Sequence, residues 1–518
     1  MKIKGTYLLA RWTAVLLSIA LLPSCAFAMD GAVYEIFVAS FYDSDGDGMG
    51  DLNGVTQKLD YVQELGAQNL WLMPINPSPS YHKYDVTDYL AIAPEYGTMA
   101  DFDALAAACE ERGMGLLIDL VINHSSHLHP WFVSATQSLS IEPCGQEICA
   151  TVPACREHNQ YCRYYHFTQD GTGHSIPAAD GWTYEGAFGY HMPDLNLDEP
   201  LVRHEIQSIM IYWLGHGATG FRLDAVLHYY GENVMQNTEF MTWLTDTGKA
   251  IDPDCFFVAE AWKDGGTILK LYESGIDSFF GFPMGDATGE IIGRLRKSEG
   301  YALATKAAQW QADVRAVNAD AIDAPFLTNH DMGRSAGVLV QQLPRMKLAA
   351  SIYLLMGGTP YIYYGEELGM TGSGIDENKR LPMLWSADDP IGICNPPASA
   401  DQAQKLTIGA DAQATDGASL LSHYRNVLAV RNANPVIGSG TMTAIDTGNK
   451  AVMALRFEDE KSCVEVYHNL SKKIAAEFLV SSEATYIASF EGHRDIKTIL
   501  DEQTLTLPIE SSVILKIR

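Results

Sequence analysis

Along most of the chain, short apolar segments alternate with longer segments whose apolar residues recur at helical spacing. The short segments are VYEIFV (33–38), NLWLMP (69–74), GLLIDLV (115–121), GFRLDA (220–225), FFVAEAW (256–262), SFFGFP (278–283), PFLTNH (325–330) and TPYIYY (359–364). Their near-continuous apolar character is typical of parallel strands buried on both faces. Eight such β/α units predict an α/β protein with a TIM (β/α)8 barrel. A doubly wound sheet is the alternative, but no G-x-G-x-x-G motif follows the first strand.

Two departures from this alternation predict further domains. The connection that follows the third apolar segment is very long and is rich in Gly, Cys, His and aromatic residues, so we expect a small inserted domain at 124–198. The barrel would then comprise 29–123 and 199–434. From 435 to 518 the pattern changes to strict alternation, as in VMALRF and SSVILKIR, which predicts a C-terminal antiparallel β domain.

The N-terminal segment has the pattern of an export signal. Lys2, Lys4 and Arg11 precede an apolar run that is too short to span a bilayer, and an A-x-A cleavage site ends at Ala28. We therefore predict a signal peptide at 1–28 and a secreted or periplasmic protein. The alternative is a lipoprotein signal, which would leave an acylated Cys25 as a lipid anchor. No later apolar run is long enough to predict a membrane span.

Composition and charge restrict the kinds of partner. The 518 residues exceed what one compact core holds, and 47% hydrophobic with 19% charged residues is typical of globular domains. A formal net charge of −29 argues against nucleic acid or an anionic membrane as a partner. We expect a monomer, and the acidity alone does not indicate a chemistry.

Four of the nine cysteines lie close together in the predicted insertion: Cys144, Cys149, Cys155 and Cys162. In an exported protein this spacing predicts two disulfides, with three pairings left open. A zinc site is the alternative, but the spacing does not match paired C-x2-C knuckles and no pattern of histidines supports it. The remaining cysteines of the mature chain are scattered, which is typical of buried or unpaired thiols.

Polar residues gather where the predicted strands end. They are Asp119, Asn123 and His124 after the third strand, Arg222, Asp224 and His228 at the fourth, Glu260 at the fifth, and Asn329, His330 and Asp331 at the seventh. The carboxyl ends of the strands form the active-site face of a TIM barrel. Core ion pairs could explain one or two of these residues but not the whole set, because carboxylates in apolar strands are costly.

Paired carboxylates without a nucleophilic Ser or Cys favour glycoside hydrolysis. Arg222 would favour the charged form of Asp224, as a nucleophile requires. The apolar neighbours of Glu260 would raise its pKa, as a general acid requires. Metal-dependent hydrolysis is the competing chemistry, in which the carboxylates would ligate a catalytic ion.

These residues carry a resemblance to a known family. DLVINH (119–124), GFRLDAVLH (220–228), VAEAW (258–262) and FLTNHD (326–331) resemble, in order, the four motifs of the α-amylase family, glycoside hydrolase family 13. HMPDLN (191–196), YHKYDVTDY (81–89), YYGEELG (363–369) and RLPMLW (380–385) extend the resemblance over essentially the whole mature chain. The chain is most similar to a bacterial α-amylase group intermediate between α-amylases and oligo-1,6-glucosidases.

The resemblance implies a role for each site residue. Asp224 would be the nucleophile, Glu260 the acid/base, and Asp331 the third carboxylate, which holds the ring hydroxyls of the sugar. Five residues would bind substrate: Tyr84, His124, Arg222, His228 and His330. The implied activity is retaining, endo-acting hydrolysis of α-1,4 bonds in starch and maltooligosaccharides by double displacement.

Other activities of the family remain open at this point. They are those of an α-glucosidase, an oligo-1,6-glucosidase or a maltooligosaccharide transglycosylase. Leu227 stands where many α-amylases carry a Lys that binds the sugar beyond the cut, and this departure favours short substrates or transfer. A sugar-binding or transporter-subunit relative without catalysis is disfavoured, because all three carboxylates are present.

The stretch FYDSDGDGMGDLNGV (41–55) predicts a calcium loop. Asp43, Asp45, Asp47, Met49 through its carbonyl, and Asp51 occupy positions 1, 3, 5, 7 and 9 of an EF-hand loop. Position 12, which needs a Glu, is Gly54, and a strand precedes the loop where an EF-hand has a helix. We therefore expect a structural Ca²⁺, with a solvated acidic turn as the alternative. The resemblance further implies a second site at Asn123 and Asp194.

Overall fold

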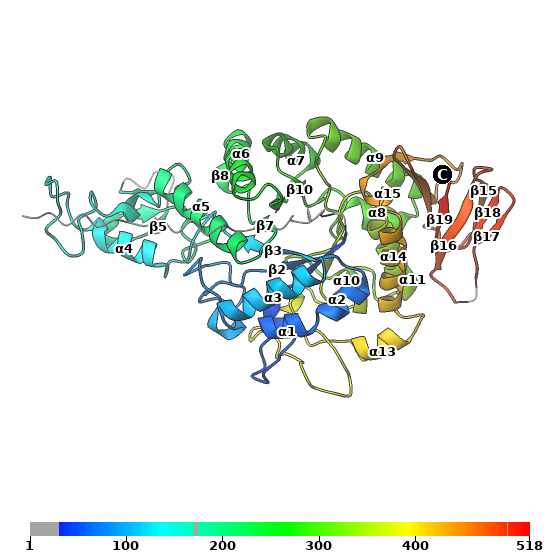
Figure 1. The fold of residues 1–518 in the computed structure, drawn as a ribbon, viewed down its shortest axis with the longest axis horizontal. Helices are drawn as coiled ribbons and strands as arrows, with labels where there is room; N and C mark the ends of the chain where they lie inside the picture. Colours follow the sequence, from blue (N-terminus) through cyan, green and yellow to red (C-terminus); the bar gives the residue numbers. More distant parts are fainter. Residues whose placement is uncertain (1–28, 30, 170–174, 495) are drawn as a thin grey trace, which may run out of the picture.

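At the centre of the molecule lies a parallel sheet with the strand order β10-β9-β7-β3-β2-β1-β11 (Figure 1). The computed structural model describes residues 29, 31–169, 175–494 and 496–518. The strands are β1 (Val33–Ile36), β2 (Asn69–Leu72), β3 (Gly115–Leu120), β7 (Gly220–Leu223), β9 (Phe256–Ala259), β10 (Ser278–Phe279) and β11 (Tyr361–Tyr363). All their residues are buried, as expected of strands that are covered on both faces.

At the eighth position of the barrel, the chain makes one bridge and several backbone hydrogen bonds instead of a regular strand. Phe280 bridges Ala324 in parallel, and the Tyr361 amide donates to the Pro325 carbonyl (2.9 Å). The chain therefore runs between β10 and β11 and closes the barrel, but the strand predicted at 325–330 does not form. Beyond Pro325 the backbone has other partners: the Leu327 carbonyl accepts from the Asp286 amide (2.9 Å), and the Asn329 carbonyl accepts from the Met332 amide (3.3 Å) in a turn. The predicted TIM barrel is confirmed, with this correction.

Helices surround the barrel (Figure 1), although the short α12 lies at the active-site cavity and α15 packs on strands of the C-terminal domain. They are α1 (Leu52–Gln57), α2 (Leu59–Leu65), α3 (Met99–Glu111), α5 (Pro200–Gly215), α6 (Val234–Ile251), α7 (Gly265–Leu271), α8 (Glu290–Lys297), α9 (Gly300–Val317), α10 (Ser335–Val338), α11 (Leu343–Leu354), α12 (Asp376–Lys379), α13 (Ala410–Thr415), α14 (Leu420–Ala433) and α15 (Val436–Ser439). Local sequence sets their ends: Thr98 and Asp101 form a capping box at α3, and Gly66 ends α2 in the left-handed conformation.

A small insertion between β3 and α5 projects from one end of the molecule (Figure 1). It contains α4 (Pro130–Leu139), β4 (Phe167–Thr168), β5 (Ile176–Pro177) and β6 (Thr183–Tyr184), with the sheet order β4-β6-β5. The bridges His124–Asp194 and Tyr165–Leu195 return the segment to the barrel. A short strand, β8 (Tyr229–Glu232), follows β7.

The cysteines of the insertion have free thiols in this structure, so the two predicted disulfides are absent from the described residues. Three of these cysteines lie together, whereas Cys162 lies on a separate turn and donates to the Ala135 carbonyl (3.6 Å). The two disulfides therefore stay a prediction that this structure does not show.

The opposite end of the molecule is an antiparallel β domain, as predicted (Figure 1). Its strands are β12 (Thr441–Ala444), β13 (Val452–Glu458), β14 (Cys463–Asn469), β15 (Ala476–Leu479), β16 (Thr485–Glu491), β17 (Ile499–Asp501), β18 (Thr504–Leu507) and β19 (Ser511–Lys516). They form one sheet with the order β12-β13-β14-β19-β16 and a second with the order β15-β18-β17. Helix α9 packs on β12 and β13 and joins this domain to the barrel.

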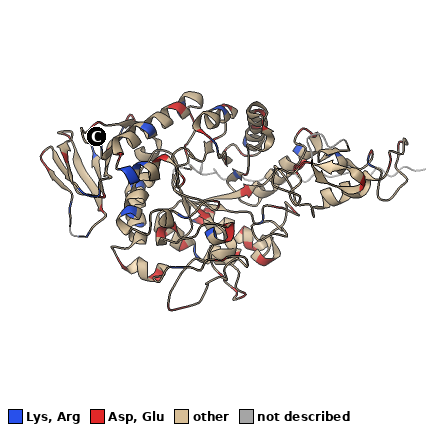
Figure 2. Cartoon of the chain, turned by 180° about the vertical axis from the view of Figure 1, so that it is seen from behind, with Lys and Arg blue, Asp and Glu red and all other residues tan. Residues whose placement is uncertain are grey.

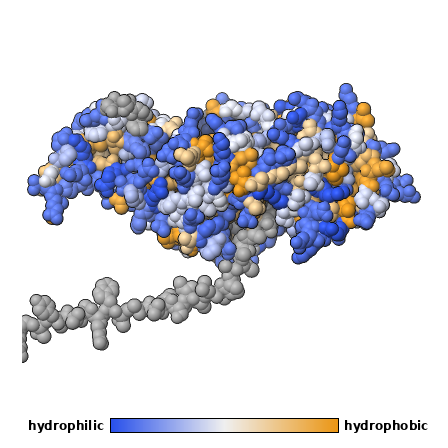
Figure 3. All heavy atoms as spheres, turned by 90° about the horizontal axis from the view of Figure 1, so that it is seen from above, coloured by the Kyte–Doolittle hydropathy of each residue, from blue (hydrophilic) through white to orange (hydrophobic). Residues whose placement is uncertain are grey.

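The surface is polar and of mixed charge. Acidic residues are spread over the helices around the barrel with Lys and Arg between them (Figure 2), and hydrophobic residues form small separate groups on the face in Figure 3. Among the described residues, no helix has the length and apolar character that crossing a membrane requires.

Candidate active site

One buried arginine organises the carboxylates at the carboxyl ends of the strands. Arg222 on β7 is fully buried, and its Nη1 donates to Asp119 (2.6 Å) and to Asp224 (2.7 Å). Its Nη2 donates to Glu260. The strand order β9-β7-β3 explains this contact, because Glu260 follows β9 and Asp119 lies on β3, on either side of the arginine strand. Glu260 and Asp224 therefore sit on the two amino groups of one guanidinium.

The chain turns sharply after the nucleophile candidate. Ala225, directly after Asp224, has φ of +50°, which is strained for a residue with a side chain. Strain of this kind is retained where the surrounding structure fixes a side chain in a needed position. Here the turn holds Asp224 against Arg222 and beside the cavity.

The environment of the carboxylates separates their proton affinities. Burial raises the pKa of Glu260 to about 7, although Arg222 acts in the opposite direction, and the charges of Asp224 and Asp331 raise it further. Burial likewise raises the pKa of Asp119 to about 6. A glutamic acid with such a pKa is about half protonated at pH 7 and mostly protonated below it, so it has a proton to donate.

The third carboxylate is held in its charged form. His330 Nε2 lies 3.1 Å from one oxygen of Asp331, and Arg380 Nη2 donates to the other (3.1 Å). On its far side, His330 Nδ1 contacts Glu35 on β1 (2.5 Å). Burial alone would lower the pKa of His330, but Asp331 and Glu35 raise it to about 10. Burial would raise the pKa of Asp331, but the charges of His330 and Arg380 hold it well below its usual range.

These groups border a cavity of about 390 Å³. It is lined by His82, Tyr84, His124, Phe188, Met192, Asp224, Ala225, Leu227, His228, Glu260, Trp262, Asp331, Asp376 and Arg380. The half-exposed Trp262 stacks on Phe282 with ring centres 5.4 Å apart, and Phe188 reaches in from the insertion. Exposed aromatic faces beside paired carboxylates are suited to a sugar, which has apolar ring faces and polar edges.

One buried histidine at the cavity can form a further hydrogen bond. His124 is almost fully buried, yet its Nε2 has no hydrogen-bond partner among the described residues. Burial lowers the pKa of His124 to about 4, so the ring is neutral near pH 7. A buried polar atom without a partner at a cavity wall indicates that a bound molecule supplies one.

The structure divides the predicted site residues into two layers. Those that line the cavity are Tyr84, His124, Asp224, His228, Glu260 and Asp331. Arg222 and His330 are not among the lining residues and lie behind the carboxylates that they contact. The structure thus brings together all eight, although it gives two of them a supporting position instead of a substrate contact.

Sequence reasoning missed two partners of these groups. Glu35 and Arg380 fix His330 and Asp331, whereas Asp119, which shares Arg222, was noted at a strand end but given no role. Glu35 was detectable as an acidic residue within the apolar segment VYEIFV, and Arg380 as the first residue of RLPMLW. Nothing in the sequence indicated which carboxylate each of them would contact.

The predicted calcium loop brings several of its carboxylates together. One oxygen of each of Asp43, Asp45 and Asp51 lies within 4.8 Å of the others, whereas Asp47 is not part of this group. Asp43 accepts from the amides of Gly46 (2.6 Å) and Gly48 (2.8 Å), which curls the loop around it. Three hard oxygen donors on a tightly curled loop fit Ca²⁺.

The residues proposed for a second ion also meet. Asn123 Nδ2 donates to Asp194 Oδ1 (3.0 Å), and the Ala187 amide donates to the other oxygen of Asp194 (2.9 Å). Burial raises the pKa of Asp194 to about 7. The pair joins the barrel to the insertion by a direct hydrogen bond, and a second ion at this place stays a prediction.

Comparison with known proteins identifies the family. A model described as "Alpha amylase, catalytic domain" matches residues 35–440. The chain belongs to the α-amylase family. "Alpha-amylase 3" of Dictyoglomus thermophilum is 36% identical over 451 residues, which cover 85% of this chain and 84% of that protein. A "Trehalose synthase" of Thermus thermophilus is 30% identical over 498 residues, which cover 86% of this chain and 50% of that protein.

A solved structure agrees with this assignment. "Eubacterium rectale Amy13B" superposes with a TM-score of 0.89 at 38% identity and covers 95% of this chain and 96% of that one. The protein is thus a family 13 glycoside hydrolase, and the resemblance inferred from the motifs is confirmed at the level of the family and the fold.

Proposed function

We propose that this α-amylase family member is an exported, retaining, endo-acting hydrolase of α-1,4 bonds in starch and maltooligosaccharides. One observation carries the proposal: Asp224 and Glu260 share the guanidinium of Arg222, and burial raises the pKa of Glu260 to about 7. A carboxylate paired with a cation beside a carboxylic acid is the arrangement that double displacement requires.

In the proposed reaction, Glu260 protonates the glycosidic oxygen while Asp224 attacks the anomeric carbon. The leaving chain departs with that proton, and a glycosyl ester remains on Asp224. Glu260, now a carboxylate, then takes a proton from water as the water oxygen attacks the same carbon, which frees the sugar and regenerates the acid. Asp331, held charged by His330 and Arg380, would bind ring hydroxyls as positive charge develops on the sugar.

Two observations bear on the choice of substrate. The aromatic rings of Trp262 and Phe188 are substantially exposed at the cavity, which suits a chain that extends beyond the cut. Leu227 also lines the cavity and offers no charge to the sugar there. Transfer between sugars is the alternative activity, because one relative is named a trehalose synthase.

A product time course tests the proposed activity. Soluble starch, maltotriose, isomaltose and pullulan are incubated with the enzyme, and products are separated with the anomer of each new reducing end recorded. Early mixed maltooligosaccharides of α configuration from starch are expected. Glucose alone from short substrates or isomaltose, with starch untouched, would instead make the enzyme an α-glucosidase and exclude the endo-acting proposal.

The pH dependence of kcat/KM should report the ionisation of Glu260. Activity is expected to fall as the pH rises through about 7, because the raised pKa keeps the general acid protonated up to that point and deprotonation removes it. An aryl maltooligosaccharide whose leaving group needs no protonation is the control, and its basic limb should be much weaker. A limb near 4.5, the ordinary glutamate value, would contradict the assignment.

We further propose that Asp43, Asp45 and Asp51, with Asp47 and the Met49 carbonyl, bind one structural Ca²⁺. A chelator is expected to lower the melting temperature by several degrees, because an ion that binds only the folded state stabilises it. Added calcium should restore the melting temperature of the unsubstituted protein but should not raise that of the variant Asp43→Asn. An unsubstituted protein whose melting temperature does not respond to added calcium would exclude the site.

Export is part of the same proposal. The signal segment 1–28 and Cys25 lie outside the described residues, so the proposal rests on the sequence pattern alone. N-terminal sequencing of the mature protein separates the two forms: a free terminus near Met29 indicates cleaved secretion, and a blocked terminus at Cys25 indicates a lipid anchor.

A further inference from the structure

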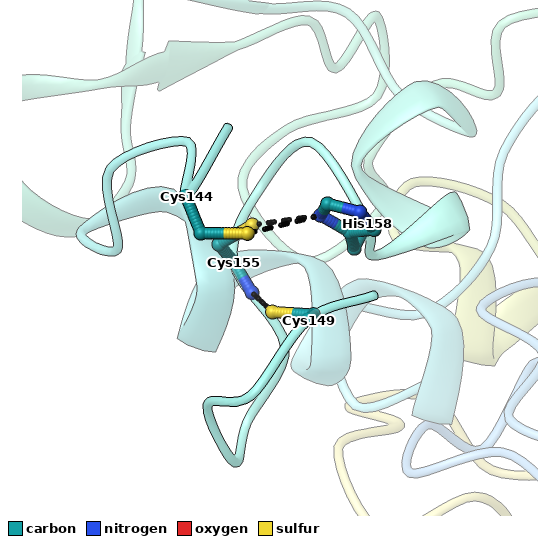
Figure 4. Close-up of side chains that lie close together, drawn as sticks. All are labelled: Cys144, Cys149, Cys155 and His158. Atoms are coloured by element: carbon teal, nitrogen blue, oxygen red, sulfur yellow. Dashed lines mark hydrogen bonds between the residues drawn. The ribbon is translucent and has the colours of Figure 1, made fainter. Parts of the chain in front are cut away.

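Three cysteines and a histidine of the insertion converge on one point (Figure 4). One ligand atom from each of Cys144, Cys149, Cys155 and His158 lies within 4.8 Å of all the others. His158 Nδ1 is 3.6 Å from the sulfur of Cys144 and 3.1 Å from that of Cys155, and the ring nitrogen faces both sulfurs. Of the described residues, only this group and the acidic loop at Asp43 bring three or more such side chains so close together.

We propose that Cys144, Cys149, Cys155 and His158 bind one structural zinc ion. Three thiolates and one imidazole form a closed tetrahedral set, the usual coordination of structural zinc. Zinc–ligand bonds of ordinary length place neighbouring ligand atoms about 3.5–3.8 Å apart, and the sulfur–nitrogen distances here are already close to this. The cysteine spacing alone disfavoured zinc, because it does not match paired C-x2-C knuckles, whereas the set that includes His158 has the spacing C-x4-C-x5-C-x2-H.

A backbone amide favours the thiolate form of one of the sulfurs. The Cys155 amide donates to the sulfur of Cys149 (3.3 Å), a contact that stabilises a negative sulfur. On binding, each of the three thiols releases its proton, while neutral His158 donates its Nδ1 lone pair, so the occupied site carries one negative charge.

The local fold shows what the ion would stabilise. Residues 140–159, all of them described, contain no helix or strand, and two of the three branched aliphatic side chains of this loop, Ile148 and Val152, are 81% and 99% exposed. The base of the loop is closed where the Arg156 amide donates to the Ile141 carbonyl (3.3 Å) and the Arg156 side chain pairs with Glu142. Beyond that base, the side chains of the loop come together at the cysteine–histidine group. A loop without an apolar core needs a metal or a disulfide to stabilise its conformation.

A disulfide accounts for the geometry less well. Three sulfurs are in the group, so one disulfide would leave one thiol unpaired beside it. Cys162 does not supply the fourth, because its thiol faces the Ala135 carbonyl and burial raises its pKa to about 11. None of the four proposed ligands lines the active-site cavity, so the ion is structural and the proposal does not depend on the proposed activity.

The decisive measurement is the metal content of the purified full-length protein, prepared in zinc-containing medium without added chelator. One equivalent of zinc per chain is expected from elemental analysis, with an intact mass that shows all thiols reduced after removal of the metal. Replacement of zinc by Co²⁺ should produce the strong visible bands of a tetrahedral thiolate site. A zinc-free protein, whether two hydrogens lighter through a disulfide or fully reduced, would overturn the proposal.

Variants locate the ion. Cys149→Ser and His158→Gln should lose zinc, whereas the matched control Cys162→Ser should retain one equivalent. Proteases are expected to cut the 142–158 loop faster in the first two, while starch hydrolysis stays unchanged. Equal zinc in Cys149→Ser and the control would place the metal elsewhere and refute the assignment. If the variants do not fold, the metal content and cobalt spectrum of the unsubstituted protein still decide the question.

Discussion

Glu260→Gln and Asp224→Asn should each lower kcat on starch by about 10³-fold or more, with little change in melting temperature. The amides occupy nearly the same volume, and each keeps an oxygen to accept from Arg222, so the buried contacts survive. Glutamine has no proton to donate to the leaving oxygen, and asparagine is a poor nucleophile. Steady-state kinetics beside a thermal melt of each purified variant measure both quantities.

Leaving-group dependence separates the two roles. On an aryl glycoside with an acidic phenol, Glu260→Gln should regain much of the rate of the first step, because this leaving group departs without a proton. Asp224→Asn should stay inactive on both substrates, because attack on the anomeric carbon is lost in either case. Turnover close to that of the unsubstituted enzyme in either variant on starch would remove the proposed mechanism.

Arg222→Met should be the most destabilising of these single substitutions. Arg222 is fully buried and contacts Asp119, Asp224 and Glu260, so its loss leaves three carboxyl groups without their shared cation. Breaking a buried ion pair in this way costs about 3–5 kcal/mol of the free energy of unfolding. Activity should disappear as well, because both proposed catalytic groups lose the partner that positions them.

Denaturant unfolding measures this effect against an exposed pair. Arg494→Met removes a cation that is largely exposed and lies 3.4 Å from Asp416, and it should change the free energy of unfolding by no more than about 0.5 kcal/mol. Compared with Arg222→Met, the variant Arg222→Lys restores the positive charge, but its single ammonium group cannot donate to carboxylates from neighbouring strands as the planar guanidinium does. It should therefore recover more of the stability than of the activity. Similar losses for Arg222→Met and Arg494→Met would mean that Arg222 is not the organising residue.

The barrel could be predicted from sequence because its strands are buried on both faces and therefore carry an unbroken apolar pattern. The pattern failed at 325–330, where PFLTNH is apolar enough for a strand but the chain leaves the sheet after one bridge. Apolar character reports burial, and this segment is buried whether or not it makes the hydrogen bonds of a strand.

Individual site residues were detectable, but their pairings were not. Asp224, Glu260 and Asp331 stood out as carboxylates at strand ends, which is a local property of the sequence. The contacts Glu35–His330 and Arg380–Asp331 join residues that are far apart in the chain, so only the closed barrel specifies them. His158 was overlooked for a similar reason, because its role depends on the folding back of the loop onto Cys144.

The side chains of the active site also hold the eighth position of the barrel together. Where one bridge and backbone hydrogen bonds of a non-strand segment join β10 to β11, Glu35 on β1 contacts His330, His330 contacts Asp331, and Arg380 contacts Asp331 from the next loop. The groups that would bind substrate therefore also stabilise the wall of the barrel at which the predicted strand does not form. Hydrogen exchange should be fastest there among the barrel walls, and heat should abolish catalysis before the remaining strands separate.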